Sequence, residues 1–238
     1  MPSELFRFKQ FDLLHGEGYK IGTDAVLLGS WAGSDPNIKR ILDLGSGTGV
    51  IGFLLAQRFP KAQVHLLERN EAAVQECHAN IARSPFADRI QCIHADVLDW
   101  KNTEPYDLVV SNPPYFASAL PSSNPQKVSA KHISSEDQIK WFEKMEELVN
   151  QEDGKIALVL SNKHLKAQKN ALPVVFSSFQ LNRKLAVSHR PHSNPSLLLL
   201  EYGKEETKSE DQWSILSSNG SFSDEYSALC KDFLLSVK

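Results

Sequence analysis

Asn112-Pro113-Pro114-Tyr115 is the stretch of this sequence whose residue types are best suited to chemistry. It follows residues 106–111, which read as a buried strand, and two consecutive prolines end a strand because they remove backbone donors. The side-chain carbonyl of Asn112 and the main-chain carbonyl of Pro113 then offer two acceptors, and the Tyr115 ring offers a flat face. A planar –NH2 group donates two hydrogen bonds, so the tetrapeptide suits an amino group on a base or an amide. The alternative is an ordinary strand-ending turn, in which Asn and Pro are common.

The second candidate is a glycine-rich turn between a predicted strand, Ile41–Leu44, and a predicted helix, Val50–Arg58. Nucleotides bind at such strand–turn–helix units in doubly wound sheets. Asp43 stands just before the turn, where a carboxylate repels a pyrophosphate but holds an ammonium group, directly or through water. The pattern therefore favours a cationic cofactor such as S-adenosylmethionine. The glycines that let the backbone bend and approach this ligand are Gly45, Gly47 and Gly49.

Two further predicted strands also end in acids. Glu68 ends the strand that begins at Val64, where a carboxylate can accept both ribose hydroxyl protons. Asp96 ends a third strand and can accept from an adenine amino group; the alternative is an N-cap for the following turn. In an open parallel sheet these strand ends meet at one edge, where ligands bind. Four residues are thus expected together: Asp43, Glu68, Asp96 and Asn112.

Length and composition limit the class of protein. The chain has 238 residues, 41% of them hydrophobic, which predicts one domain with a substantial core. A net charge of −3 excludes a general polyanion binder. The cysteines are scattered, odd in number and without a paired motif, which predicts free thiols, a reducing compartment and no metal site. No signal peptide or membrane span is recognisable, so we expect a cytoplasmic protein.

The N-terminal segment, residues 4–31, alternates phenylalanines with polar residues before an apolar turn. Thr23 or Asp24 is predicted to cap that turn as a helix begins. One interpretation is a helix packed against the main sheet. The other is a lid over the ligand site, in which Thr23 contacts the cofactor.

The chain resembles class I S-adenosylmethionine-dependent methyltransferases that methylate amino groups, and more closely the bacterial tRNA1(Val) adenine-N6 methyltransferases. The resemblance spans nearly the whole chain. It is carried by Phe6-Arg-Phe-Lys-Gln-Phe11, Lys20-Ile-Gly-Thr-Asp-Ala25, Leu28-Gly-Ser-Trp-Ala32, Leu42-Asp-Leu-Gly-Ser-Gly-Thr-Gly49, Ser111-Asn-Pro-Pro-Tyr-Phe116 and Phe222-Ser-Asp-Glu-Tyr-Ser-Ala-Leu229.

This resemblance implies a Rossmann-like α/β fold whose seven-stranded, mainly parallel sheet has one antiparallel strand and helices on both faces. It implies S-adenosylmethionine as cofactor and, as substrate, the adenosine just 3′ of a tRNA anticodon. We expect a monomer with a single domain over residues 1–238: a lid or cap (1–35), a catalytic core (36–202), and a C-terminal loop and capping helix (203–238).

The rest of the sequence agrees with that fold. Ser134–Asn150 has helical spacing, and Lys155–Leu160 reads as a buried strand. Residues 174–188 and 196–202 are predicted to form a final pair of strands. A loop is expected from Gly203 to Asp211, and a capping helix over Ser223–Val237.

One charge asymmetry points to RNA. Between Lys155 and Leu200 there are seven Lys or Arg residues and no Asp or Glu. We interpret this as a basic face for RNA phosphates; the alternative is a set of separate solvated faces. The candidate RNA contacts are Lys127, Lys163, Lys166, Lys169 and Arg190.

Other substrates and roles fit the same chemistry. The tetrapeptide would hold a protein glutamine amide equally well, although enzymes of that kind carry a helical domain ahead of the glycine loop. A guanine amino group of ribosomal RNA or a DNA adenine is a further substrate. A binding module that keeps the fold without catalysis is the alternative from another class.

Overall fold

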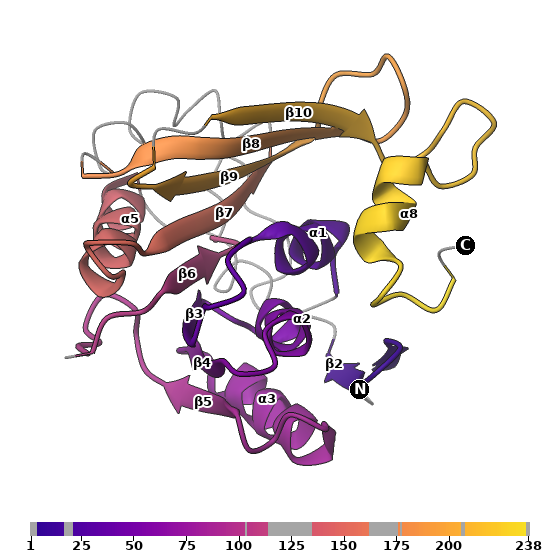
Figure 1. Cartoon of the computed structure of the whole chain (residues 1–238). Helices are drawn as coiled ribbons and strands as arrows, with labels where there is room; N and C mark the ends of the chain where they lie inside the picture. The colour runs from indigo at the N-terminus through magenta and orange to yellow at the C-terminus, as the bar shows by residue number, and fades with distance from the viewer. Residues whose placement is uncertain are drawn as a thin grey trace.

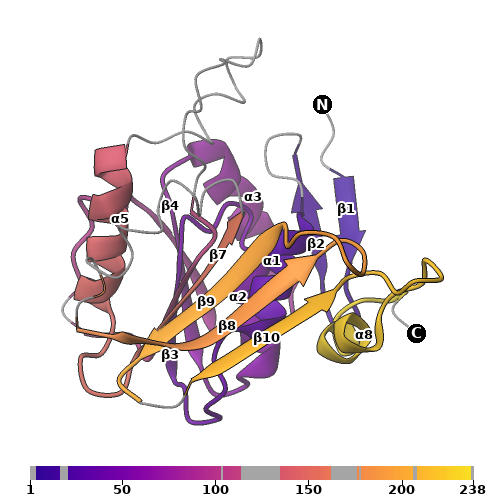
Figure 2. The same cartoon turned by 90° about the horizontal axis from the view of Figure 1, so that it is seen from above.

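The computed structural model describes residues 4–16, 21–102, 104–113, 135–161, 176, 178–205 and 208–236. Its centre is an eight-stranded sheet of order β10-β8-β9-β7-β6-β3-β4-β5 (Figure 1). β9 runs antiparallel to both β7 and β8, and the other neighbouring pairs are parallel (Figure 2). The strands are β3 (Arg40–Leu44), β4 (Gln63–Glu68), β5 (Ile90–His94), β6 (Leu108–Ser111), β7 (Lys155–Ser161), β8 (Gln180–Ser188), β9 (Leu197–Gly203) and β10 (Ser209–Ser214).

Helices cover both faces of this sheet. α1, α2 and α3 lie on one face, and α5 lies on the other (Figure 1). Successive residues of a central strand point to opposite faces and join different apolar clusters. In β6, Val109 belongs to one cluster and Val110 to the other. A strand buried on both faces reads as a continuous apolar run, which is why the central strands were recognisable in the sequence. The helices are α1 (Thr23–Trp31), α2 (Val50–Arg58), α3 (Glu71–Arg83), α5 (Ser135–Leu148) and α8 (Asp224–Cys230).

The order of the strands locates the ligand crevice. The chain enters the sheet at β3, moves outward through β4 and β5, and then returns to place β6 on the other side of β3. Connections that leave the carboxyl ends of β3 and β6 therefore diverge to opposite faces of the sheet. Open α/β sheets bind their ligands at this reversal point.

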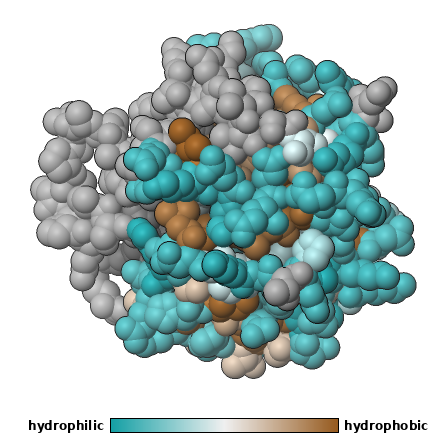
Figure 3. Space-filling view, turned by 90° about the vertical axis from the view of Figure 1, so that its left-hand side faces the viewer, coloured by the Kyte–Doolittle hydropathy of each residue, from teal (hydrophilic) through white to brown (hydrophobic). Residues whose placement is uncertain are grey.

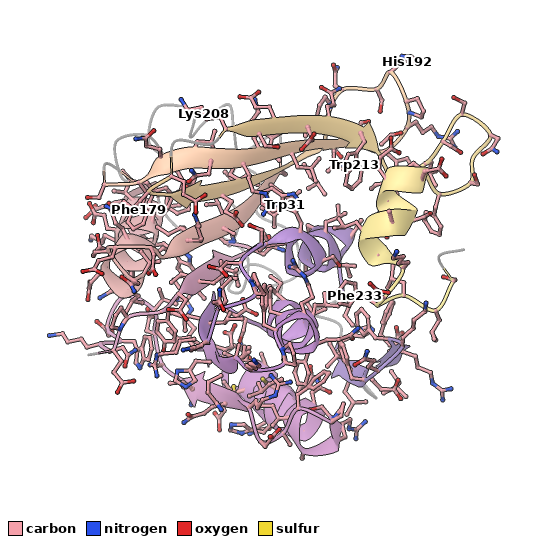
Figure 4. The ribbon with its side chains drawn as sticks, in the orientation of Figure 1. Trp31, Phe179, His192, Lys208, Trp213 and Phe233 are labelled. Carbon is pink, nitrogen blue, oxygen red and sulfur yellow. The ribbon has the colours of Figure 1, made fainter. Side chains whose placement is uncertain are left out.

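A small hairpin of β1 (Glu4–Arg7) and β2 (Asp12–His15) joins the two ends of the chain. Phe11 stacks on Phe53 of α2, with ring centroids 5.6 Å apart. The backbone N–H of Lys9 donates to the carbonyl of Phe233, 2.8 Å away, so the hairpin is attached to the segment after α8 (Figure 4). Aromatic packing thus fixes the hairpin on the face of the sheet that α2 covers.

Asn80 of α3 attaches the hairpin to the glycine turn. Its side chain is fully buried and makes three hydrogen bonds. Its Oδ1 accepts from the backbone N–H of Leu14 (2.7 Å), and its Nδ2 donates to the carbonyls of Leu14 (3.0 Å) and Thr48 (3.2 Å). One amide therefore connects β2, α3 and the loop after β3.

We expect Asn80→Ala to lower the free energy of unfolding by about 3 kcal/mol, because one buried and two half-buried backbone groups lose their partner. Denaturant unfolding measures this change, and hydrogen exchange at the Leu14 amide reports detachment of the hairpin. The matched control is Gln75→Ala, an exposed position on the same helix. Equal stability of the two variants would show that Asn80 does not hold the hairpin.

The structure corrects three predictions. Residues from Ser209 to Ser214 form an eighth strand, β10, where a loop was expected. α8 ends at Cys230, seven residues earlier than predicted, because the chain then turns to pair Leu234 with Phe8 of the hairpin. The N-cap of α1 is Gly22 and has no side-chain hydrogen bond, so neither Thr23 nor Asp24 has the capping position predicted for it.

α1 packs against α2 and β7. Its buried residues run from Ala25 to Trp31. The interpretation of this part of the N-terminal segment as a helix packed against the main sheet is therefore confirmed.

The surface on the α5 side is mostly hydrophilic, with hydrophobic residues in small separate areas (Figure 3). Cys77, Cys92 and Cys230 are free thiols, as predicted. Within the described ranges, no helix has the length and apolar character needed to span a bilayer.

Candidate active site

Asn112 is the first residue after β6, so it stands at the carboxyl edge of the sheet next to the glycine turn of β3. Its side chain is half-buried. Its Nδ2 donates to Oδ2 of Asp24 in the first turn of α1, over 2.9 Å. The other oxygen of Asp24 accepts from the backbone N–H of Ala25, also over 2.9 Å. The sequence alone did not indicate this pairing, because the two residues are 88 positions apart.

The glycine turn has the backbone conformation expected of it. Gly45, Gly47 and Gly49 all have positive φ, at 69°, 56° and 92°. A side chain at Gly49 would be strained, and its Cβ would lie 2.9 Å from Leu66. Backbone N–H groups of Gly45 and Ser46 donate to the carbonyl of Leu67, so the turn is tied to the neighbouring strand β4.

Asp43 belongs to β3, and its side chain lies inside the protein against the first turn of α2. Its side chain is fully buried, and Oδ2 accepts from the backbone N–H of Gly52 over 3.1 Å. Oδ1 is buried without a hydrogen-bond partner among the described residues. Burial raises the pKa of Asp43 to about 7; the Gly52 hydrogen bond opposes this shift and the charge of Glu68 adds to it. This carboxyl group therefore has one acceptor oxygen available. A positively charged ligand beside it would stabilise its ionised form, which burial disfavours.

Glu68 is the last residue of β4, and its side chain holds the glycine turn that follows β3. Oε2 accepts from the backbone N–H of Gly47 (2.9 Å), and Oε1 accepts from that of Asn70 (2.7 Å). The side chain is buried. Each carboxylate oxygen has two lone pairs, so Glu68 keeps capacity for hydroxyl donors.

Asp96 lies two residues beyond β5 and is half-buried. Oδ1 accepts from the backbone N–H of Leu98 over 2.9 Å, the turn-stabilising role considered from the sequence. Oδ2 lies 3.3 Å from Nη1 of Arg69 in a partly exposed ion pair. Asp96 is therefore anchored at the rim of the site.

The remaining predicted site residues differ in how they are placed. Thr23 is exposed at the start of α1, and Pro113 is buried directly after Asn112. Pro114 and Tyr115 lie outside the described residues, as do Lys127, Lys163, Lys166 and Lys169. No group of three His, Cys, Asp or Glu side chains in the described part of the chain is arranged to hold a metal ion.

Trp141 of α5 is a site residue that sequence reasoning missed. Its Nε1 donates to Oγ of Ser111 over 3.1 Å, and Ser111 donates to the carbonyl of Leu44 over 2.9 Å. A Cβ built on Gly45 would lie 2.8 Å from the Trp141 ring. The indole thus packs on the glycine turn and bonds to the residue before Asn112. A Trp at helical spacing is typical of the core, so its type and position carry no signal of this contact.

Trp141→Phe is expected to weaken cofactor binding several-fold and to lower the free energy of unfolding by about 1–3 kcal/mol, because Ser111 loses a donor and the turn loses packing. Isothermal titration and denaturant unfolding measure the two effects. Trp213→Phe on β10, far from the turn and beside α8 (Figure 4), is the control. An unchanged cofactor affinity for Trp141→Phe would refute the positioning role of the indole.

Part of the predicted basic face lies within the described residues. Three of its cations are paired with acids: Lys155 with Glu205 (2.9 Å), Arg183 with buried Glu201 (3.0 Å) and Lys184 with Glu210 (3.0 Å). These lysines and this arginine stabilise the far strands of the sheet, and Arg183 also stacks on Trp31.

Arg190 is placed differently. It is exposed in the β8–β9 loop, near the outer tip marked by His192 (Figure 4). β8 runs parallel to β7, since both are antiparallel to β9. This loop therefore leaves the sheet at the same edge as Asn112.

Residues 22–185 match the family model of the methyltransferase small domain. Curated relatives named tRNA1(Val) (adenine(37)-N6)-methyltransferase align with nearly the whole chain. The protein from Porphyromonas gingivalis is 35% identical over 98% of this chain and 96% of its own length. The Bacteroides thetaiotaomicron protein is 34% identical over the full length of both. The Vibrio campbellii protein is 30% identical over 98% of this chain and 96% of its own.

Solved structures show the same fold. A "predicted O-methyltransferase" from Agrobacterium tumefaciens superposes with a TM-score of 0.67 at 19% identity, covering 88% of this chain and 96% of its own. A glycopeptide N-methyltransferase complexed with S-adenosylmethionine gives a TM-score of 0.54 at 13% identity, covering 72% and 90%. The chain therefore belongs to the tRNA1(Val) (adenine(37)-N6)-methyltransferase family, a group of S-adenosylmethionine-dependent enzymes built on the methyltransferase small domain.

Proposed function

We propose that this protein methylates the N6 amino group of adenosine 37, next to the anticodon, in tRNA1(Val). The observation that carries the proposal is the position of Asn112. It places a side-chain amide at the end of β6, beside the glycine turn that follows β3. The names of relatives that are 30–35% identical over nearly the whole chain support the same reaction and substrate.

The residues at the sheet edge fit S-adenosylmethionine. Asp43 has a buried oxygen without a partner among the described residues, which suits a positively charged ligand. Asp43 would hold the ammonium group of the cofactor, directly or through water. Glu68 accepts the ribose hydroxyls, Asp96 and Thr23 line the rim, and the positive-φ glycines make room for the ligand. The bound cofactor supplies an electrophilic methyl group on a sulfonium.

The chain's own chemical contribution is made at the amino group of the base. The adenine amino nitrogen is a weak nucleophile because its lone pair is delocalised into the ring. Oδ1 of Asn112 and the carbonyl of Pro113 accept its two N–H groups. This pulls the nitrogen toward a pyramidal geometry and localises the lone pair. Catalysis then depends mainly on alignment, to which oriented acceptors contribute without a strong general base.

The base must leave any stack to reach these acceptors, which an anticodon loop permits. We assign Tyr115 to stacking on the target base and Arg190 to the RNA backbone, the latter because its loop leaves the sheet at the same edge as Asn112. The roles of Lys127, Lys163, Lys166 and Lys169, the three-part division of the chain, a cytoplasmic location and a monomeric state stay predictions.

The proposal is tested by radiolabelled methyl transfer from S-adenosylmethionine to total tRNA from a strain that lacks this gene, followed by nucleoside mass spectrometry. We expect N6-methyladenosine in a valine tRNA. The control is the same tRNA from the parent strain, which should accept little label because its adenosine is already methylated. Label in protein, ribosomal RNA or DNA, with none in tRNA, would contradict the proposed substrate.

A further inference from the structure

The hydrogen bond between Asn112 and Asp24 connects the N-terminal segment to the reacting group. Its 2.9 Å length and its partners, Nδ2 and Oδ2, are those of a good hydrogen bond. The Asp24 side chain is itself held, because its Oδ1 accepts from the backbone N–H of Ala25. The Asn112 amide is therefore bonded to a fixed acceptor.

A carboxylate decides which way an amide points. The amide of Asn112 has one end that donates and one that accepts, and the two ends are nearly the same size. A carboxylate only accepts, so it bonds to the NH2 end and turns the carbonyl oxygen away. Without Asp24 the amide is free to adopt the reverse orientation. In that orientation it presents N–H groups to another –NH2 group, and no hydrogen bond forms.

The backbone before α1 leaves room for this carboxylate. A Cβ built on Gly22 would overlap Oδ1 of Asp24, so a larger residue at position 22 would displace the carboxylate. Gly22 has an ordinary extended conformation, with φ −93°. Gly22 is therefore needed for the space that it leaves to the Asp24 side chain, and not for an unusual backbone conformation.

We propose that Asp24 is a positioning residue that holds the Asn112 amide with its carbonyl oxygen toward the amino group to be methylated. This rests on the proposed function of the site. It makes the N-terminal segment part of the catalytic apparatus. It also restricts the site to substrates that donate a hydrogen bond to position 112.

The first test is Asp24→Asn, which keeps the size of the side chain and removes its acceptor-only character. We expect kcat to fall by about 10- to 100-fold, the range for losing a hydrogen bond to a charged group. The KM values for S-adenosylmethionine and tRNA should stay within about three-fold, since neither ligand loses a contact. The control is Asp224→Asn, which removes an exposed first-turn acid from α8. A kcat within two-fold of wild type for Asp24→Asn would overturn the proposal.

A reciprocal exchange separates orientation from general damage. Asn112→Asp alone places two carboxylates against each other and should lose activity by more than Asp24→Asn does. Combining it with Asp24→Asn lets the new amide at position 24 donate to the new carboxylate, which again offers an oxygen to the substrate. We expect the double variant to be at least ten-fold more active than Asn112→Asp. No recovery in a double variant with wild-type cofactor affinity would overturn the proposal.

A measurement without substrate tells this proposal apart from the proposed function. The side-chain amide protons of Asn112, assigned by their loss in Asn112→Asp, should be shifted and slowly exchanging in wild type. They should move to ordinary positions in Asp24→Ala. A wild-type protein that methylates no tRNA contradicts the proposed function, whereas unchanged Asn112 amide resonances in Asp24→Ala contradict the orienting role of Asp24.

Discussion

Asn112→Ala is expected to lower kcat by about 10²- to 10³-fold while the Kd for S-adenosylmethionine changes by less than about three-fold. The substitution removes the side-chain acceptor for the amino group of the base and leaves the glycine turn, Asp43 and Glu68 in place. Single-turnover methyl transfer gives the rate, and isothermal titration gives the affinity. The two measurements separate a substrate contact from a cofactor contact.

The matched control for this variant is Asn102→Ala. Asn102 also donates a side-chain hydrogen bond, to the carbonyl of Glu104, but precedes β6 at a distance from the carboxyl edge. It should retain wild-type kcat. A parallel loss of cofactor affinity and kcat in Asn112→Ala would instead place the residue against the cofactor and refute its assigned role.

The second large effect is expected at Asp43. Burial raises its pKa from 3.8 to about 7, so the folded protein holds this proton to a higher pH than the unfolded chain does. The stability that the group contributes is therefore complete below pH 4 and is lost as the pH rises to about 7. The loss amounts to roughly 4 kcal/mol over that window. Asp43 thus destabilises the ligand-free protein at neutral pH.

Asp43→Asn should consequently raise the Tm of the ligand-free protein at pH 8 by about 3 °C or more, with the difference disappearing near pH 4. The Asn oxygen keeps the hydrogen bond from Gly52, while the charge is removed. The Kd for S-adenosylmethionine should rise by about 10- to 100-fold at pH 8, because the cation loses its buried counter-charge. Calorimetry and titration over pH 4–8 measure both effects.

Asp107→Asn is the control for cofactor affinity. Asp107 accepts from the backbone N–H groups of Lys39 and Arg40, at the opposite end of the strands. It should leave the Kd for S-adenosylmethionine unchanged. A Kd for Asp43→Asn that equals the wild-type value at pH 8 would mean that the buried charge serves only the fold.

Local pattern was sufficient to predict the parts of the fold that are buried on both faces. The bounds of α2 agree with those expected from the apolar run after the glycine turn. The acids at strand ends were recognisable because the chain places them just before or after an apolar run. Their convergence followed from parallel topology.

Elements without a local pattern were missed. β10 is an edge strand whose residues are exposed or half-exposed, so Ser209–Ser214 lacks the alternation that marks a half-buried strand. Phe233 and Leu234 have helical spacing from Tyr226, but pairing with the hairpin ends α8 before them. Only a contact with the other end of the chain decides between helix and turn there.

The residues that position the site could not be predicted from the sequence. Asp24 and Asn80 act through partners 88 and 66 residues away. Trp141 acts through Ser111, 30 residues away. A polar or aromatic residue on a helix has the same local appearance whether it faces a site or the core. The acceptor at Asn112 could therefore be predicted, whereas the residues that orient it could not.

The most direct test of the proposed reaction uses two synthetic tRNA1(Val) transcripts that differ only at position 37, one with adenosine and one with guanosine. Purified protein and radiolabelled S-adenosylmethionine should label the first transcript to about one methyl group per molecule, recovered as N6-methyladenosine, and leave the second unlabelled. Equal labelling of both transcripts, or none of the first, would contradict methylation of adenosine 37.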